Sequence, residues 1–180
     1  MRVISGEKRG FKLQGPNGNH SRPTEDKIKE AIFNILFPLI PDAICLDVFS
    51  CTGSIGIEFL SRGAKKVYFS ELNYDNIKIL KENLIKTDYL ERSEILRGDF
   101  RKNISLINEQ IDYIYLDPPY KKGFYTIAFE EIMKKEEFKN SQIIVESDQD
   151  IDYSKEFHDL KRRFHRSYGR KYISIYERLK

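Results

Sequence analysis

The apolar positions of this chain follow two alternating patterns. Short runs rich in Val, Ile, Leu and aromatic residues predict strands at 44–49, 66–70, 93–97, 113–116 and 142–146. Longer stretches with apolar residues every three or four positions predict helices at 55–62, 74–86, 101–108 and 124–135. Strands that alternate with helices favour a parallel sheet covered on both faces, which is the doubly wound α/β class.

The two ends of the chain depart from this alternation. Near the amino end, residues 2–5 and 11–13 predict a small hairpin, and the Gly- and Asn-rich stretch 14–22 predicts a loop. A helix then begins at Pro23 and ends at Pro38 and Pro41. Near the carboxyl end, residues 160–164 and 172–176 predict an antiparallel pair. We therefore expect one domain over residues 1–180, with an amino-terminal extension over residues 1–40.

Length and composition fit a single globular domain. The chain has 180 residues, 33% of them charged, and no apolar run near the roughly 20 residues that span a bilayer. The amino terminus lacks the apolar core of a secretory signal. Cys45 and Cys51 lie in neither a C-x-x-C motif nor a Cys/His cluster, so we expect no metal site and a reducing cytoplasm.

Positive charge is concentrated near both ends. Residues 159–171 contain six Lys or Arg against one Asp, and residues 1–12 contain four against one Glu. Two basic ends around an apolar middle suit a surface that binds phosphates, although a solvated exterior is the alternative for either run. No membrane partner is expected.

The chemically most informative stretch is Asp117-Pro118-Pro119-Tyr120, which directly follows a predicted strand. Two prolines end the strand ladder and stiffen the turn, so they hold the carboxylate and the ring on a rigid corner. A nucleobase with an exocyclic amine requires an acceptor for its N–H groups and a flat face for stacking. Asp117, Pro118 and Tyr120 are therefore the predicted catalytic residues.

A second group of residues predicts a site for an adenosine-containing ligand. Four acids lie near or just after the carboxyl ends of four successive predicted strands, at the edge where such sheets bind ligands: Asp47, Glu71, Asp99 and Asp117. The stretch Cys51-x-Gly53-x-x-Gly56 is the dinucleotide fingerprint with its first glycine replaced. Gly53 is expected to let the backbone approach the ligand, and Gly56 to let helix and strand pack closely.

Two adenosine-containing ligands can be compared by how many of these residues each one accounts for. A nicotinamide cofactor uses a similar loop and a ribose-binding acid. It explains neither Asp99 nor residues 117–120, which we call the Asp117 corner. S-adenosylmethionine explains both. Phe49 is assigned to the same cofactor site, with a place in the core as its alternative.

The residues above resemble those of the RsmD-type 16S ribosomal RNA (guanine-N2) methyltransferases. The similar segments are 1–6, 22–34, 46–58, 61–64, 117–120 and 145–147, in the family's order. The resemblance implies a seven-stranded class I methyltransferase fold with its last strand antiparallel. It also implies transfer of a methyl group from S-adenosylmethionine to N2 of a guanosine in 16S ribosomal RNA, within an assembling small subunit. We expect the protein to be a monomer.

The resemblance guides the remaining assignments. The extension over residues 1–40 is expected to face RNA, and the predicted RNA-binding residues are Arg9, Lys12, Arg22, Arg166 and Arg170. One departure concerns Cys51, which stands where the family has glycine. Because a side chain is costly at positive φ, we expect Cys51 to have a negative φ and to point away from the ligand.

Two other functions fit the same residues. An adenine-N6 methyltransferase of DNA or RNA shares the Asp117 corner, although 180 residues leave little room for a separate target-recognition region. A catalytically silent RNA-binding assembly factor would have lost donor binding through Cys51. The retained acids Glu71, Asp99 and Asp117 argue against this second alternative.

Overall fold

The computed structural model describes residues 1–16, 23–119 and 123–179, and across them the strands form one seven-stranded sheet in the order β3-β2-β1-β4-β5-β7-β6. The strands are β1 (Ile44–Asp47), β2 (Lys66–Glu71), β3 (Ser93–Arg97), β4 (Tyr113–Leu116), β5 (Gln142–Ser147), β6 (Leu160–Tyr168) and β7 (Lys171–Arg178). The first five strands run parallel, and β7 runs antiparallel to both β5 and β6.

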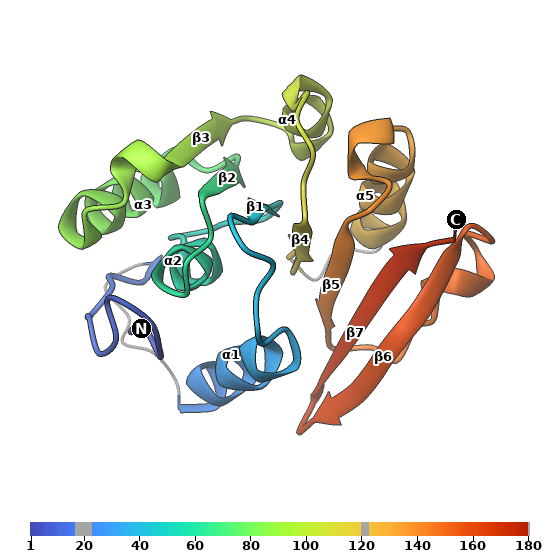
Figure 1. Ribbon diagram of the computed structural model, residues 1–180, viewed down its shortest axis with the longest axis horizontal. Helices are drawn as coiled ribbons and strands as arrows, with labels where there is room; N and C mark the ends of the chain where they lie inside the picture. Colours follow the sequence, from blue (N-terminus) through green and yellow to red (C-terminus); the bar gives the residue numbers. More distant parts are fainter. Residues whose placement is uncertain (17–22, 120–122, 180) are drawn as a thin grey trace.

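Helices cover both faces of this sheet (Figure 1). They are α1 (Pro23–Ile35), α2 (Ser54–Ser61), α3 (Tyr74–Thr87), α4 (Phe100–Leu106) and α5 (Phe124–Met133). Short 3₁₀ turns occur at Leu90–Arg92 (η2), Glu136–Phe138 (η3) and Tyr153–Lys155 (η4). The class I methyltransferase fold predicted from the sequence is thereby confirmed.

Alternating side chains of each strand feed two separate hydrophobic layers. Cys45 and Phe69 pack with the apolar faces of α1, α2 and α3, whereas their neighbours Leu46 and Tyr68 pack with α4 and α5. Successive side chains of a strand point to opposite faces, so a strand buried on both faces must be apolar throughout. This requirement explains why the central strands read as continuous apolar runs.

The element boundaries differ from the prediction mainly at the edges of the fold. β3 and β4 have the predicted bounds, while β6 and β7 extend well beyond the predicted pair. The predicted amino-terminal hairpin is present but short, with a bridge between Arg2 and Lys12 and backbone hydrogen bonds that join residues 1–3 to residues 10–13. It does not extend past Val3, because the amides of Ile4 and Ser5 donate to the carboxylate of Glu58 in α2.

Glu58 fastens the amino-terminal segment and α1 to the body of the protein. Its side chain is 0% exposed, and it accepts hydrogen bonds from the amides of Ile4 and Ser5 and from Nε of Arg62, at 2.8–3.0 Å. Lys29 of α1 lies 3.6 Å from the same carboxylate and donates to the carbonyl of Arg2 at 2.6 Å. A buried charge is tolerated only when it is paired and hydrogen-bonded in this way.

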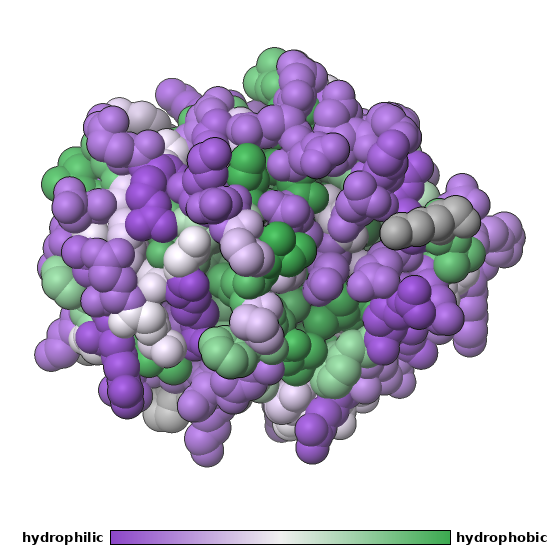
Figure 2. Space-filling view, in the orientation of Figure 1, coloured by the Kyte–Doolittle hydropathy of each residue, from purple (hydrophilic) through white to green (hydrophobic). Residues whose placement is uncertain are grey.

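Hydrophobic residues reach the surface mainly in the middle of the face shown in Figure 2, over β1, β4 and β5, whereas its margins are mostly hydrophilic, with smaller hydrophobic areas at the upper left and the top. None of the helices in the described part of the chain is long and apolar enough to cross a membrane.

We predict that Glu58→Ala lowers the free energy of unfolding by about 3–5 kcal/mol, because it removes the only carboxylate paired with the buried Lys29 ammonium among the described residues and the acceptor of two part-buried backbone amides. The matched control is Glu30→Ala on the exposed side of α1, which should change stability by no more than about 0.5 kcal/mol. Urea unfolding of both variants measures this difference. Equal stability of the two variants would contradict the anchoring role of Glu58.

Candidate active site

A cavity of about 640 Å³ lies at the carboxyl ends of β1, β2, β3 and β4. Parallel strands end at the same edge, so the loops that follow them converge there. Three predicted acids, Glu71, Asp99 and Asp117, line this one cavity, as does Phe49. Asp47 and Gly53 are not among its lining residues. The structure therefore brings together four of the six residues assigned to the cofactor site.

Glu71 organises the loop between β1 and α2. Its two carboxylate oxygens accept hydrogen bonds from the amides of Cys51 and Asn73, each at 2.7 Å. Each oxygen keeps a further lone pair, because a carboxylate oxygen accepts two hydrogen bonds. Glu71 is thus fixed by its own neighbours and remains able to accept hydrogen bonds from a ligand.

The expectation that Cys51 has a negative φ is wrong. Its φ is 49°, in the left-handed region, and Cys51 is among the residues that line the cavity. The turn directs the Cys51 amide at Glu71, and this hydrogen bond holds the residue in a conformation that a glycine adopts without cost.

Gly53 and Gly56 are needed for internal packing. Gly53 has φ 86°, and a Cβ built there would lie 2.3 Å from Cδ1 of Leu80 in α3. A Cβ on Gly56 would lie 2.1 Å from the ring of Phe69 in β2, in line with the close helix–strand packing expected there. Any contact of Gly53 with a ligand remains a prediction.

Asp47 lies at the end of β1. Its side chain is buried, and Oδ1 has no hydrogen-bond partner among the described residues. Burial raises the pKa of Asp47 to about 7, since desolvation outweighs the opposing influence of the nearby backbone amides of Gly56 and Phe49. An unpartnered buried carboxylate oxygen beside the cavity suits a ligand that carries N–H groups or positive charge.

Asp99 already has a local role as the cap of α4. It accepts the amide of Arg101 at 2.9 Å and pairs with the guanidinium of the same residue. The hydrogen bonds from Arg101 lower the pKa of Asp99 to about 2, so the carboxylate stays charged at the cavity wall.

Aromatic rings that the sequence reasoning missed complete the cavity. Phe100 lies 4.9 Å from Phe49 and 5.9 Å from Phe124 between ring centroids, and all three residues line the cavity. Phe100 directly follows Asp99, and Phe124 begins the helix after the Asp117 corner. Their positions in the sequence, next to predicted site residues, could have indicated that both rings belong to the site.

The Asp117 corner lies at the wall of the cavity. The Asp117 side chain is 37% exposed and faces the cavity, Pro118 is buried, and Pro119 lines the cavity. Desolvation, followed by the negative charge of Glu146, raises the pKa of Asp117, while Lys171 opposes this rise from 3.7 Å. Tyr120, the third predicted catalytic residue, lies outside the described residues.

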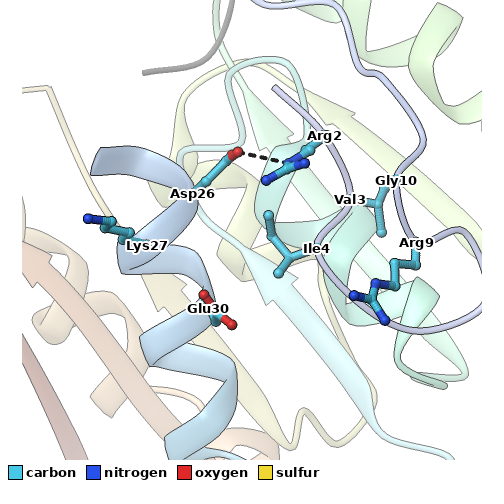
Figure 3. A pocket seen from close by; sticks show the side chains of 8 residues that line it. All are labelled: Arg2, Val3, Ile4, Arg9, Gly10, Asp26, Lys27 and Glu30. Carbon is cyan, nitrogen blue, oxygen red and sulfur yellow. Dashed lines mark hydrogen bonds and ion pairs between the residues drawn. The ribbon is translucent and has the colours of Figure 1, made fainter. Parts of the chain in front are cut away.

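The predicted RNA-binding residues occupy two separate surfaces. Arg9 lines a shallow cavity of about 480 Å³ between the amino-terminal segment and α1. Figure 3 shows Arg2, Arg9 and Lys27 around this cavity, with Arg2 paired to Asp26. Lys12 is exposed on the same segment, and Arg166 and Arg170 are exposed near the β6–β7 turn. Arg22 lies outside the described residues.

Comparison with known proteins places this geometry in a family. Residues 1–177 match the family described as conserved hypothetical protein 95. The chain belongs to this family, which is the RsmD family of methyltransferases. The resemblance noted from the sequence is thereby confirmed.

Three relatives illustrate the similarity. A putative rRNA methyltransferase of Bacillus subtilis, YlbH, is 32% identical over 99% of both chains. The ribosomal RNA small subunit methyltransferase D of Haemophilus influenzae is 38% identical over 83% of this chain and 80% of its own. The solved structure of the putative methyltransferase yhhF from Escherichia coli superimposes with a TM-score of 0.84, at 26% identity, over 99% of this chain and 98% of that one.

Strain at Cys51 yields a stability prediction. Cys51→Gly removes the side chain from the left-handed backbone, whereas Cys51→Ala keeps Cβ and removes only the thiol. We expect the glycine variant to be more stable than the alanine variant by about 1 kcal/mol, measured by urea unfolding. An alanine variant at least as stable as the glycine variant would show that the backbone at Cys51 is unstrained.

Proposed function

We propose that this protein methylates the exocyclic N2 amine of a guanosine in 16S ribosomal RNA, with S-adenosylmethionine as the methyl donor. The observation that carries the proposal is the single cavity in which Glu71, Asp99 and Asp117 converge, one from each of three successive strands. The relatives named as ribosomal RNA methyltransferases support the substrate class.

The donor half of the cavity fits S-adenosylmethionine by its chemistry. When bound, this donor supplies a methyl group activated by a positively charged sulfur. Glu71 would accept hydrogen bonds from the ribose hydroxyls, and Phe49 and Phe100 offer apolar surface for the adenine. Asp99 would accept from the adenine amine. The unpartnered Oδ1 of Asp47 supports a role toward the donor's ammonium group, either directly or through water.

The base half of the site is the Asp117 corner. The Asp117 carboxylate and the carbonyl of Pro118 would accept the two N–H bonds of the guanine amine and orient its nitrogen toward the methyl group. The amine gains the methyl group and gives up one proton overall. Positioning supplies most of the catalysis, because the methyl group arrives already activated. Tyr120 would stack on the base, a contact worth about 1–3 kcal/mol in single-strand binders.

The basic surfaces would hold the RNA on either side of this site. Arg9 and Lys12 lie on the segment anchored by Glu58, with Arg22 following in sequence, while Arg166 and Arg170 lie near the β6–β7 turn. A base reaches the Asp117 corner only when it is unstacked. We therefore infer a substrate RNA with an exposed guanosine, presented in the cytoplasm by an assembling small subunit and bound by a monomer of the protein.

The test is transfer of a tritiated methyl group to small subunits, 16S ribosomal RNA and DNA in parallel, followed by nucleoside mapping. We expect N2-methylguanosine in the ribosomal RNA. Asp117→Ala should lower kcat by about 10²-fold or more, as loss of one preorganised polar group does elsewhere. The matched control is Asp159→Ala, an exposed acid at the amino end of β6, which should leave kcat unchanged.

Other results decide against this function. Methylated adenine would establish the N6-adenine alternative. No transfer, together with no calorimetric signal for S-adenosylmethionine, would favour the silent assembly factor. Near-full activity of Asp117→Ala would remove the assigned role of the carboxylate.

A further inference from the structure

Lys171 joins the Asp117 corner to a second acid on the neighbouring strand. It is the first residue of β7, directly after the β6–β7 turn. Its Nζ lies 3.1 Å from Oε1 of Glu146 and 3.7 Å from Oδ1 of Asp117. Antiparallel pairing of β7 with β5 brings the start of β7 to the carboxyl end of β5, and hence to the cavity edge.

Glu146 is itself firmly held. It is buried at the end of β5, and its Oε2 accepts a 2.6 Å hydrogen bond from the hydroxyl of Tyr115. Burial raises the pKa of Tyr115 well above its usual value, so the phenol remains a donor. The hydroxyl of Tyr125 donates to the backbone carbonyl of Glu146 at 2.7 Å. Glu146 therefore has a fixed position beside Asp117.

The charge balance around Asp117 depends on Lys171. Burial and the neighbouring Glu146 disfavour the ionised form of Asp117, and Lys171 favours it. The titratable or charged groups that face Asp117 come from five places in the fold: Asp47, Tyr115, Tyr125, Glu146, Asp148 and Lys171. Five of these are acids or phenols near the site, so removal of Lys171 would leave adjacent carboxylates without the ammonium that lies between them.

We propose that Lys171 is a positioning residue that keeps Asp117 ionised and oriented for the target amine, and that Glu146 fixes Lys171 in this place. This inference rests on the proposed function for its role in catalysis. The clustered geometry of the three side chains stands independently of that function.

The experiment compares pH profiles of kcat for the wild type, four variants at the site and one control variant. Lys171→Met keeps the aliphatic stem and removes the charge, so a higher pH is needed to ionise Asp117. The pH at which kcat is half-maximal on the acidic side of the profile should therefore increase by about one unit or more, the size of shift typical for a charge at this distance. Activity should approach that of the wild type at high pH. Lys171→Arg keeps the positive charge, so the acidic side of its pH profile should stay close to that of the wild type.

Two further variants separate charge from packing. Glu146→Gln removes the repelling charge and should move the acidic limb to lower pH. In the double variant Glu146→Gln/Lys171→Met, the pH of half-maximal kcat on the acidic side should return toward the wild-type value. Lys139→Met is the control, because Lys139 forms an exposed surface pair with Glu136 in η3. It should leave the profile unchanged.

A second readout requires neither donor nor RNA. Carbon-13 NMR of labelled aspartate, assigned with Asp117→Asn, follows the titration of Asp117 directly and should show the same shifts among the variants. This measurement decides the inference even if the wild type methylates no RNA, which would overturn only the proposed function. Identical Asp117 titration in the wild type and Lys171→Met, or a pH-independent loss that Glu146→Gln does not offset, would overturn the role of Lys171.

Discussion

Parallel strands that end at one edge of a sheet force their following residues together, and in this protein those residues are acids. Three carboxylates share one cavity and a fourth lies at the same edge. Their mutual repulsion must be offset locally, and three of the acids have different partners. Backbone amides hold Glu71, Arg101 pairs with Asp99, and Lys171 lies against Asp117. Asp47 is buried, and its Oδ1 has no hydrogen-bond partner among the described residues. The donor and base functions that we propose depend on this arrangement.

Ion pairs also connect the outer segments of the fold to the elements around the cavity. Glu58 of α2 holds the basic amino-terminal segment and α1, and Lys29, one of its partners, also donates to Ser54 at the start of α2. The loop that contains Cys51 leads directly into this helix. Lys171 has a comparable place at the other end of the sheet, where it joins the basic β6–β7 turn to the Asp117 corner. Both basic surfaces are thus attached to elements that shape the site.

The sequence predicted those features that depend on local pattern. Apolar periodicity located the strands and helices, because a strand covered on both faces must be apolar throughout. The acids at the strand ends were predictable because topology alone places them. The backbone conformation of Cys51, the packing of Gly53 against Leu80 and the place of Lys171 were not predictable in this way. The backbone of Cys51 is set by a hydrogen bond to Glu71, 20 positions away, the need for Gly53 comes from Leu80, and Lys171 meets Asp117 only through strand pairing. Such long-range contacts leave no local periodicity.

A crystal structure with S-adenosylhomocysteine and a guanosine-containing oligonucleotide tests the central claim most directly. We expect the ribose of the product at Glu71, its sulfur open toward Asp117, and N2 of an unstacked guanine within hydrogen-bond distance of the Asp117 carboxylate. An adenosyl group bound outside the cavity at the carboxyl ends of β1 to β4, or a guanine whose N2 lies far from Asp117, would contradict the account.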